Sequence, residues 1–163
     1  MKHSSIKYFF VIDFPKITLV GFLFSILIAM KLYPSGTIIN NDTVGYLFFE
    51  NFLSDLGRTI SHGKDNNFHA SLLFNMALTF AGITYIIFYY LLNTLFNSAV
   101  SRLGSIFGIL GACCLIGVAF TPADLYLDPH ILFNMWVFRF FLLSTVFYSW
   151  IMYKSDKINN FFM

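Results

Sequence analysis

Charged residues are scarce in this chain of 163 residues. Only 11% are Asp, Glu, Lys or Arg, against about 25% in soluble proteins. Hydrophobic residues make up 58% of the chain, and the mean hydropathy is +0.72. This composition excludes an ordinary water-soluble domain. The net charge of +2 gives no sign of the clustered basic surface that nucleic-acid binding requires, so no nucleic-acid partner is expected.

Cysteine is equally rare. The only two cysteines, Cys113 and Cys114, are neighbours inside an apolar run. Adjacent residues rarely meet disulfide geometry, and a thiol in hydrocarbon stays protonated and unreactive. The chain also lacks a CxxC motif, which excludes a dithiol redox centre of that kind. The sequence therefore leaves the cofactor unknown.

The chain contains several long runs of apolar residues. A helix needs about 20 mostly apolar residues to cross a bilayer core roughly 30 Å thick. With their flanks, the runs predict spans at about 14–33, 68–96, 103–121 and 130–153. We therefore expect an all-α fold in which residues 1–163 form one domain, a four-helix transmembrane bundle. The end of the first run lacks a small-x-small cleavage site, which favours a retained helix over a signal peptide.

The distribution of basic residues predicts the orientation of this integral membrane protein. An even number of spans puts both termini on one side. The basic residues on that side are Lys2, Lys7, Lys16, Arg102, Lys154 and Lys157; those on the other side are Lys31, Arg58 and Lys64. Because cytoplasmic segments carry the excess of Lys and Arg, both termini are predicted to be cytoplasmic.

Small residues recur at every fourth position in two spans. They are Gly21, Ser25 and Ala29 in the first span, and Gly104, Gly108 and Ala112 in the third. This spacing lets helix backbones approach closely in lipid, so we expect these two spans to pack together. The same ridges could instead meet between chains, which leaves a membrane-protein partner or a homo-oligomer open.

The long loop between the first two spans predicts one more helix, over residues 43–56. The stretch 40–42 offers N-caps and Gly57 offers a C-terminal stop. Its surface is mostly apolar, which is typical of a helix that lies in the membrane interface. Its polar stripe is formed by Glu50, Asn51, Ser54 and Asp55. We expect this stripe to face the bundle.

Arg139 is the only charged residue deep inside a span. It lies nine positions after His130, or about 13 Å along a helix, which is near mid-membrane. No Asp or Glu lies inside any span to pair with it. Its possible partners are Glu50 or Asp55 of the loop helix, a backbone carbonyl, or an anionic ligand such as a lipid headgroup, and snorkelling to the interface is a further alternative.

Polar residues gather at the predicted non-cytoplasmic ends of the spans. The candidate ligand- or partner-binding residues are Ser54, Asp55, Arg58, Asn75, Asp124, His130, Asn134 and Arg139. Three of these, Asp55, Asp124 and His130, are residue types that bind zinc, but the chain has no HExxH motif and no fixed ligand spacing. A nucleophilic Ser54 would need a base and an oxyanion hole. The sequence shows neither.

A sequence of short motifs resembles a known family. These are residues 54–59 (SDLGRT), Asn75, a glycine-rich third span, residues 120–124 (FTPAD) and His130. This order is similar to a prokaryotic family of small polytopic membrane proteins of unknown function, distantly similar to DRAM/Frag-type proteins. That family has more spans than this chain, and Thr121 is an insertion in its Phe-Pro-x-Asp turn. The resemblance implies a bacterial or archaeal cytoplasmic membrane and a functional region around Ser54, Asp55, Asp124 and His130.

Two functional hypotheses follow, and they leave open whether the protein is an enzyme. The first is a non-enzymatic accessory protein that binds membrane lipids or a partner through its polar cluster. The alternative is a metal-assisted hydrolase acting on a lipid, in which Asp55, Asp124 and His130 hold a metal that activates water. An ion pathway is disfavoured because it requires ionisable residues along the spans.

Overall fold

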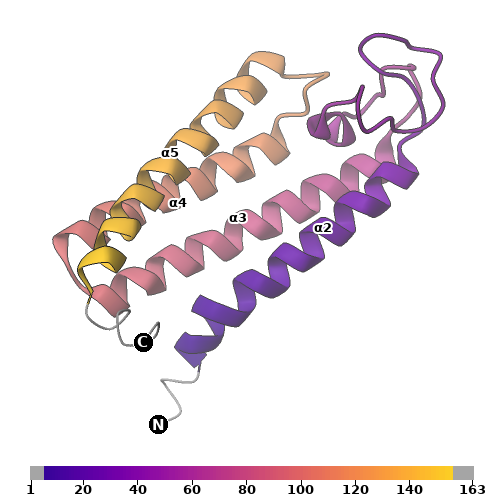
Figure 1. Ribbon diagram of the computed structural model, residues 1–163. Helices are drawn as coiled ribbons and strands as arrows, with labels where there is room; N and C mark the ends of the chain where they lie inside the picture. Colours follow the sequence, from indigo (N-terminus) through magenta and orange to yellow (C-terminus); the bar gives the residue numbers. More distant parts are fainter. Residues whose placement is uncertain (1–5, 156–163) are drawn as a thin grey trace.

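Four long helices make up most of the computed structural model, which describes residues 6–155. They are α2 (Phe14–Leu32), α3 (Phe68–Phe96), α4 (Ala99–Phe120) and α5 (Leu127–Lys154), and a π-helical segment η1 (Phe9–Asp13) leads into α2. They run alternately up and down (Figure 1). All four are long and apolar enough to span a membrane, so the all-α class and the four predicted transmembrane helices are confirmed. Lys2 and Lys157 lie outside the described residues.

The ends of the helices follow local sequence signals. Pro15 lies in the first turn of α2, where its missing N–H costs no hydrogen bond. Asn97 ends α3 in the left-handed conformation, with φ of 43°. The Ser98 hydroxyl then caps α4 by accepting a hydrogen bond from the backbone N–H of Ser101 at 3.0 Å. The resulting tight turn forces α3 and α4 into antiparallel contact.

Consecutive helices form the main contacts of the bundle: α2 packs on α3, α3 on α4, and α4 on α5. The glycines of α4 make this possible on both of its sides. A Cβ at Gly108 would lie 2.4 Å from the Tyr89 ring of α3, and one at Gly111 would lie 3.0 Å from the Phe141 ring of α5. Aromatic side chains of α3 and α5 therefore pack directly against the glycines of α4.

The predicted close packing of the first and third spans is wrong. The main contact of α2 is with α3, where the Thr18 and Thr84 hydroxyls are hydrogen-bonded at 3.1 Å. A Cβ at Gly21 would meet nothing within 4 Å, and the Ser25 hydroxyl bonds back to the carbonyl of Gly21 in its own helix. Spacing alone misled here because a glycine favours close packing only where a bulky partner side chain faces it.

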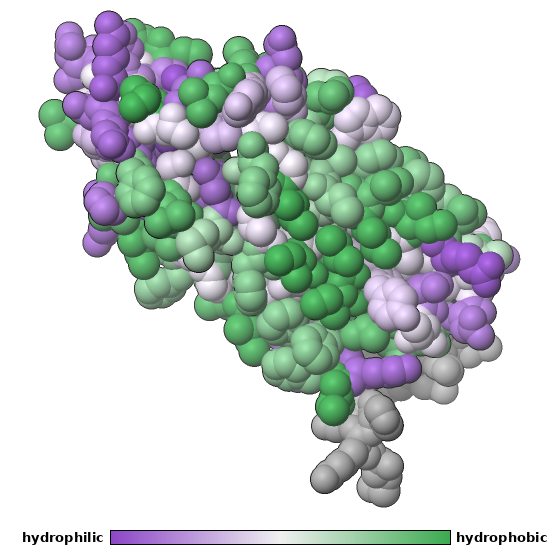
Figure 2. All heavy atoms as spheres, turned by 180° about the vertical axis from the view of Figure 1, so that it is seen from behind, coloured by the Kyte–Doolittle hydropathy of each residue, from purple (hydrophilic) through white to green (hydrophobic). Residues whose placement is uncertain are grey.

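The helical surface is apolar and the polar side chains lie at its ends. Figure 2 shows a broad hydrophobic surface over the helices and a large hydrophilic cluster at one end. We call this end, which holds residues 33–67, the loop end, and the opposite end, which holds the α3–α4 turn, the turn end. Helices α2 and α5 expose most of their side chains, so they form the edges of the bundle.

The loop of residues 33–67 is not the predicted helix over 43–56. Residues 43–52 form irregular backbone with one turn at 48–50 and a bridge from Val44 to Ser35, and η2 (Leu53–Gly57), a 3₁₀-helix, follows them. Two local features oppose a helix: Gly45 has a positive φ of 72°, and the Asn51 side chain bonds to the backbone of Leu47 and of Gly36. Asn side chains compete with helical hydrogen bonding in this way. The exposed apolar surface remains, with Phe48 and Phe49 exposed by 69% and 96%.

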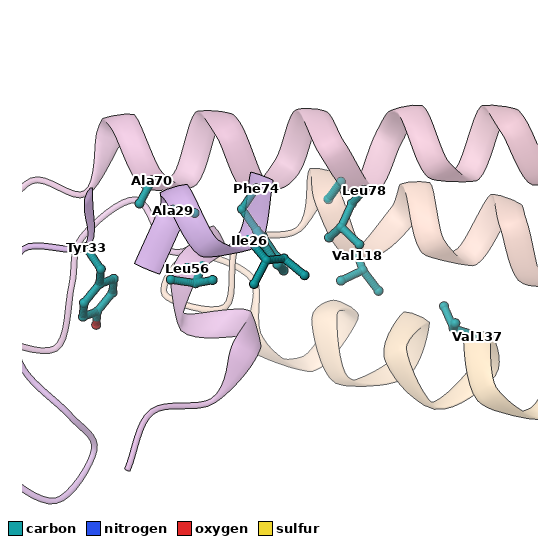
Figure 3. Close-up of a cluster of buried hydrophobic side chains, with 10 residues drawn as sticks. Ile26, Ala29, Tyr33, Leu56, Ala70, Phe74, Leu78, Val118 and Val137 are labelled. Carbon is teal, nitrogen blue, oxygen red and sulfur yellow. The ribbon is translucent and has the colours of Figure 1, made fainter. Parts of the chain in front are cut away.

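The core lies near the loop end, where the loop reaches between the helices. Leu56 of η2 is fully buried among Ile26 and Ala29 of α2 and Phe74 of α3 (Figure 3). Burying a leucine side chain contributes about 1.5–3 kcal/mol. The loop is therefore an integral part of the fold. Because Leu56 is buried between the helices, it fixes the position of η2 and of the polar groups next to it.

Candidate functional site

The Asp55 carboxylate is the centre of the folded loop. One oxygen, Oδ2, accepts hydrogen bonds from the Phe52 backbone N–H at 2.9 Å and from Asn51 Nδ2 at 3.2 Å. The other, Oδ1, lies 3.0 Å from His62 Nε2, which must donate because a carboxylate only accepts. The Asp55 side chain is 5% exposed and that of His62 is 14% exposed. Asp55 thus joins three parts of the loop.

Tyr33 holds His62 from the other side. Its hydroxyl accepts a hydrogen bond from the His62 backbone N–H at 3.3 Å and donates to the carbonyl of Gly36 at 3.3 Å. Burial raises the pKa of Tyr33 above its ordinary value. The tyrosine therefore stays neutral and keeps its donor proton. His62 is fixed through both its ring and its backbone.

Asp124 ties the loop to the link between α4 and α5. Its carboxylate accepts hydrogen bonds from the Thr59 backbone N–H and the Ile60 backbone N–H, both at 2.9 Å, and from the Thr59 hydroxyl. Burial alone would raise the pKa of Asp124, but the hydrogen bonds from Thr59 and Ile60 leave this pKa below its ordinary value. Asp124 is therefore an anionic anchor for residues 65 and 64 positions earlier in the sequence.

Helix α3 holds the other face of η2. Ser71 Oγ and Asn75 Nδ2 both donate to the carbonyl of Gly57, at 3.0 and 3.2 Å. Asn67 Nδ2 lies 2.9 Å from the Arg58 carbonyl and 3.2 Å from that of Leu56. A Cβ at Gly57 would lie 2.9 Å from Asn75 Oδ1. Only glycine allows this approach.

The other two candidate residues of the loop, Arg58 and Ser54, make few hydrogen bonds through their side chains. Arg58 is half-buried, and its Nε donates to the Ile60 carbonyl at 3.1 Å. Ser54 is half-buried, and within the described residues its hydroxyl has no hydrogen-bond partner. The structure places no imidazole beside that hydroxyl within ion-pair or hydrogen-bond distance, so it does not support a nucleophilic role for Ser54.

His130 is buried at the start of α5. Its Nδ1 donates to the carbonyl of Thr121 at 2.7 Å, and its Nε2 is buried with no partner among residues 6–155. Asn134, one turn further along, is exposed. His130 therefore ties the start of α5 to the end of α4. Asn134 takes no part in the hydrogen bonds of the loop.

The metal set considered from the sequence is not assembled. Asp55 is bonded to Asn51 and His62, Asp124 to the Thr59–Ile60 backbone, and His130 to a carbonyl. Across residues 6–155, no group of three His, Cys, Asp or Glu side chains is placed to hold a metal ion. The described residues therefore do not support the hydrolase hypothesis, in which Asp55, Asp124 and His130 hold one metal ion. Each carboxylate satisfies separate backbone groups in place of a shared centre.

A groove of about 780 Å³ opens on the membrane-facing side of α3 at the loop end. Its polar lining comes from Thr59, Asn66, Ser71, Asn75 and Thr79; its apolar lining includes Leu72, Met76, Phe80, Ile83 and Phe120. No charged residue lines it. Two polar atoms there, Asn75 Oδ1 and Asn66 Nδ2, accept or donate no hydrogen bond within the described chain. The polar side chains of the groove lie toward the loop, among apolar residues such as Ile60 and Phe68. Beyond Thr79, its lining on α3 is apolar.

Arg139 does not pair with Glu50 or Asp55. It is exposed on α5, and its guanidinium lies 5.1 Å from the centroid of the Trp136 ring. This pairing was one of the alternatives that the sequence left open. It does not form because Asp55 is already enclosed within the loop and Arg139 is exposed on α5. A charge at mid-membrane costs about 2.5–3.5 kcal/mol on insertion scales, and a cation–π contact offsets about 0.5–2 kcal/mol of it.

Several important residues escaped the sequence-based prediction. Asn67, which holds η2, belongs to no motif, and Thr59, which bonds to Asp124, belongs to the SDLGRT segment but was not singled out as a candidate. His62 was one polar loop residue among many. An Asn beside a predicted helix start is a weak signal, because such residues commonly cap the helix, and Asn67 does not cap α3. Their partners lie far away in sequence, which spacing does not reveal.

No family model, curated protein or solved structure matches this chain. The resemblance to small polytopic membrane proteins therefore stays a prediction. Two of its motifs do lie together in the structure, since Thr59, the last residue of the SDLGRT segment, bonds to Asp124, the last residue of the FTPAD segment. What joins them is the packing of the loop onto the α4–α5 link.

Proposed function

We propose that this integral membrane protein is a non-enzymatic lipid-binding protein whose ligand lies in the α3 groove. The observation that carries this proposal is the polarity gradient of the groove. Ser71 and Ile83 mark its polar and apolar parts, and twelve residues of helix correspond to about 18 Å. This is close to the half-thickness of a bilayer core, about 15 Å. One acyl chain therefore fits along α3.

The lining also favours one class of headgroup. Because the lining residues carry no charge, the groove has no fixed counter-charge for a phosphate. It offers an amide oxygen on Asn75 and an amide N–H on Asn66, which suit hydroxyl or amide groups of a lipid. We therefore expect binding that depends little on the net charge of the lipid.

The acidic and imidazole side chains of the loop support a binding role over a hydrolytic one. Asp55 and Asp124 each accept hydrogen bonds from backbone N–H groups, and the His62 ring is bonded to Asp55. A general base must be able to reach a substrate proton. The metal-assisted alternative depended on a ligand set that the described residues do not form, so no observation favours it.

Filling the groove tests the proposal. Leu72 lines the groove and is 47% exposed, whereas Leu23 on α2 is 53% exposed and lies outside it. We expect Leu72→Trp to lose the lipid that co-purifies with the wild-type protein in native mass spectrometry, and Leu23→Trp to retain it. Equal retention by wild type and Leu72→Trp would contradict the proposal, as would equal loss from both variants.

We also propose that the turn end is cytoplasmic. The start of α2, the α3–α4 turn and the end of α5 lie at the same end (Figure 1), with Lys7, Lys16, Arg102 and Lys154 near it. An excess of basic residues favours the cytoplasmic side. A membrane-impermeant maleimide should label Asp42→Cys in intact cells and label Thr94→Cys only after permeabilisation. The reverse pattern would overturn this orientation.

A further inference from the structure

The lipid-facing side of α5 carries a cation, Arg139, that pairs with no carboxylate among residues 6–155. Arg139 is exposed, and the one ion pair among residues 6–155 joins His62 to Asp55. A Cβ at Gly111, in the middle part of α4, would touch Phe140 and Phe141. Arg139 therefore lies at the mid-height of the α4–α5 pair. Ionisable residues at this depth usually mark a functional contact.

An exposed apolar strip surrounds this cation at helical spacing. We call it the Arg139 face, and its other members are Leu132, Met135, Trp136, Leu142 and Val146, all exposed by 37–65%. The strip runs for fourteen residues, or about 21 Å. No helix among the described residues covers this face, because α5 packs on α4 with its opposite side. That side carries Val137, Ser144 and Tyr148.

The depth of the guanidinium separates the possible occupants. The guanidinium lies over the Trp136 ring. Trp136 comes six positions after His130, so it lies about 9 Å further along α5 toward mid-membrane. A lipid phosphate lies at the membrane surface, above this level. A second copy in the same orientation offers no carboxylate there, because no Asp or Glu lies within Phe14–Leu32, Phe68–Phe96, Ala99–Phe120 or residues 129–154.

We propose that the Arg139 face docks a transmembrane helix of another protein that carries an Asp or Glu at mid-membrane depth. Guanidinium and carboxylate form two parallel hydrogen bonds in their best geometry. The apolar members of the face provide the helix-packing surface on either side of this pair. The proposal is independent of the lipid groove, which lies on α3.

A synthetic helix tests the proposal directly. The probe is a peptide of about 20 Leu and Ala residues with a central Glu, lysines at its ends and a dansyl acceptor. In the Trp150→Phe background, Trp136 is the only tryptophan, one turn from Arg139. Binding in phosphatidylcholine vesicles is measured as energy transfer from Trp136 to the dansyl group. We expect the Glu peptide to bind with an apparent dissociation constant at least fivefold lower than those of matched Gln and Leu peptides.

Variants at Arg139 provide the decisive controls. Arg139→Leu should abolish the preference for the Glu peptide, and Arg139→Glu should bind an Arg-centred peptide in its place. Arg102→Leu, which removes another exposed arginine at the turn end, should change nothing. Equal binding of the three peptides by the wild type would overturn the proposal. So would an Arg139-dependent dimer, or an anionic phospholipid retained only when Arg139 is present.

Discussion

The loop end and the turn end of the bundle are held by different kinds of interaction. At the loop end, buried polar side chains bond to backbone groups, as Asp124 does to Thr59 and Ile60. At the turn end, the α3–α4 connection is short, and a Cβ at Gly104 would lie 3.0 Å from the Tyr148 ring of α5. A few hydrogen bonds between helices, such as that from the Ser144 hydroxyl to the Gly104 carbonyl at 2.8 Å, supplement this packing. Polar bonds fix a backbone path at one end, and shape complementarity fixes a helix pair at the other.

This difference explains where a binding site can form. A loop whose carbonyls and N–H groups are each paired with a particular side chain has one conformation, and it can therefore form one wall of a groove. Packing of glycine against aromatic rings buries surface efficiently but leaves few polar groups to recognise a ligand. The loop end is thus suited to recognition, and the turn end to holding the helices together.

The largest effect is expected at Gly57, where the loop meets α3. Gly57→Val should destabilise the protein by about 2–4 kcal/mol, because overpacking costs about 1–3 kcal/mol and each lost hydrogen bond about 1 kcal/mol. The added carbons would meet Asn75 Oδ1 and the Phe74 ring, at 2.9 and 3.0 Å from the Cβ alone. Thermal unfolding in detergent would measure the change.

Gly21→Val provides the matched control for this prediction. Gly21 lies on the exposed side of α2, and a Cβ there would meet nothing within 4 Å. We expect its thermal midpoint to stay close to that of the wild type. If both variants lost stability equally, the loss would come from changing a glycine and not from the contact between the loop and α3.

The spans were predictable from sequence because hydrophobic length is a local property. The predicted 68–96 coincides with α3, and the predicted 14–33 ends one residue past Leu32. The start of α4 was missed by four residues, since Ser98 caps a polar first turn that an apolar run does not include. The position of Arg139 in the middle part of α5 also followed from the sequence, because spacing along a helix is regular.

The loop was not predictable in the same way. The apolar pattern and end signals of residues 43–56 favour a helix, but the amide of Asn51 bonds to Gly36, fifteen residues earlier. Asp124 was identified as a candidate, yet its partner Thr59 lies 65 positions away. One sequence contains no signal that links such positions, so the types of the polar residues were found and their groupings were not.

A smaller effect is expected when Asp124 loses its charge. Asp124→Asn should cost about 1–2 kcal/mol at pH 7, because an amide offers a single acceptor oxygen to the N–H groups of Thr59 and Ile60. The pKa of Asp124 is lowered in the folded state, whereas the unfolded value is about 3.9. Its stabilisation is therefore complete above that unfolded value and is lost as the pH falls through the lower folded value.

Thermal unfolding between pH 7 and pH 3 measures this contribution. The wild type should lose stability below about pH 4 more steeply than Asp124→Asn does. Asp128→Asn is the control, because Asp128 is exposed in the first turn of α5. Parallel pH curves for the wild type and Asp124→Asn would show that Asp124 is not the anchor of the loop.

The smallest effect is expected at the turn end, where a few hydrogen bonds between helices supplement the apolar packing. The Ser105 hydroxyl donates to the Tyr89 carbonyl at 2.6 Å, so the Tyr148 hydroxyl donates either to Ser105 Oγ or to the Ser101 carbonyl. Hydrogen bonds between membrane helices contribute about 0.6 kcal/mol on average. We expect Tyr148→Phe to cost about this much, since the ring keeps its contact with Gly104.

A double-mutant cycle of Tyr148→Phe with Ser105→Ala isolates this contact from the packing around it. The coupling should be about 0.5–1 kcal/mol, and Tyr153→Phe, at a side chain that is 81% exposed, should show none with Ser105→Ala. A coupling as large as the loss at Gly57 would mean that polar bonds hold both ends of the bundle. In that case, the two ends would not differ in how they are held, and the loop end would owe its groove to the greater length of its loop.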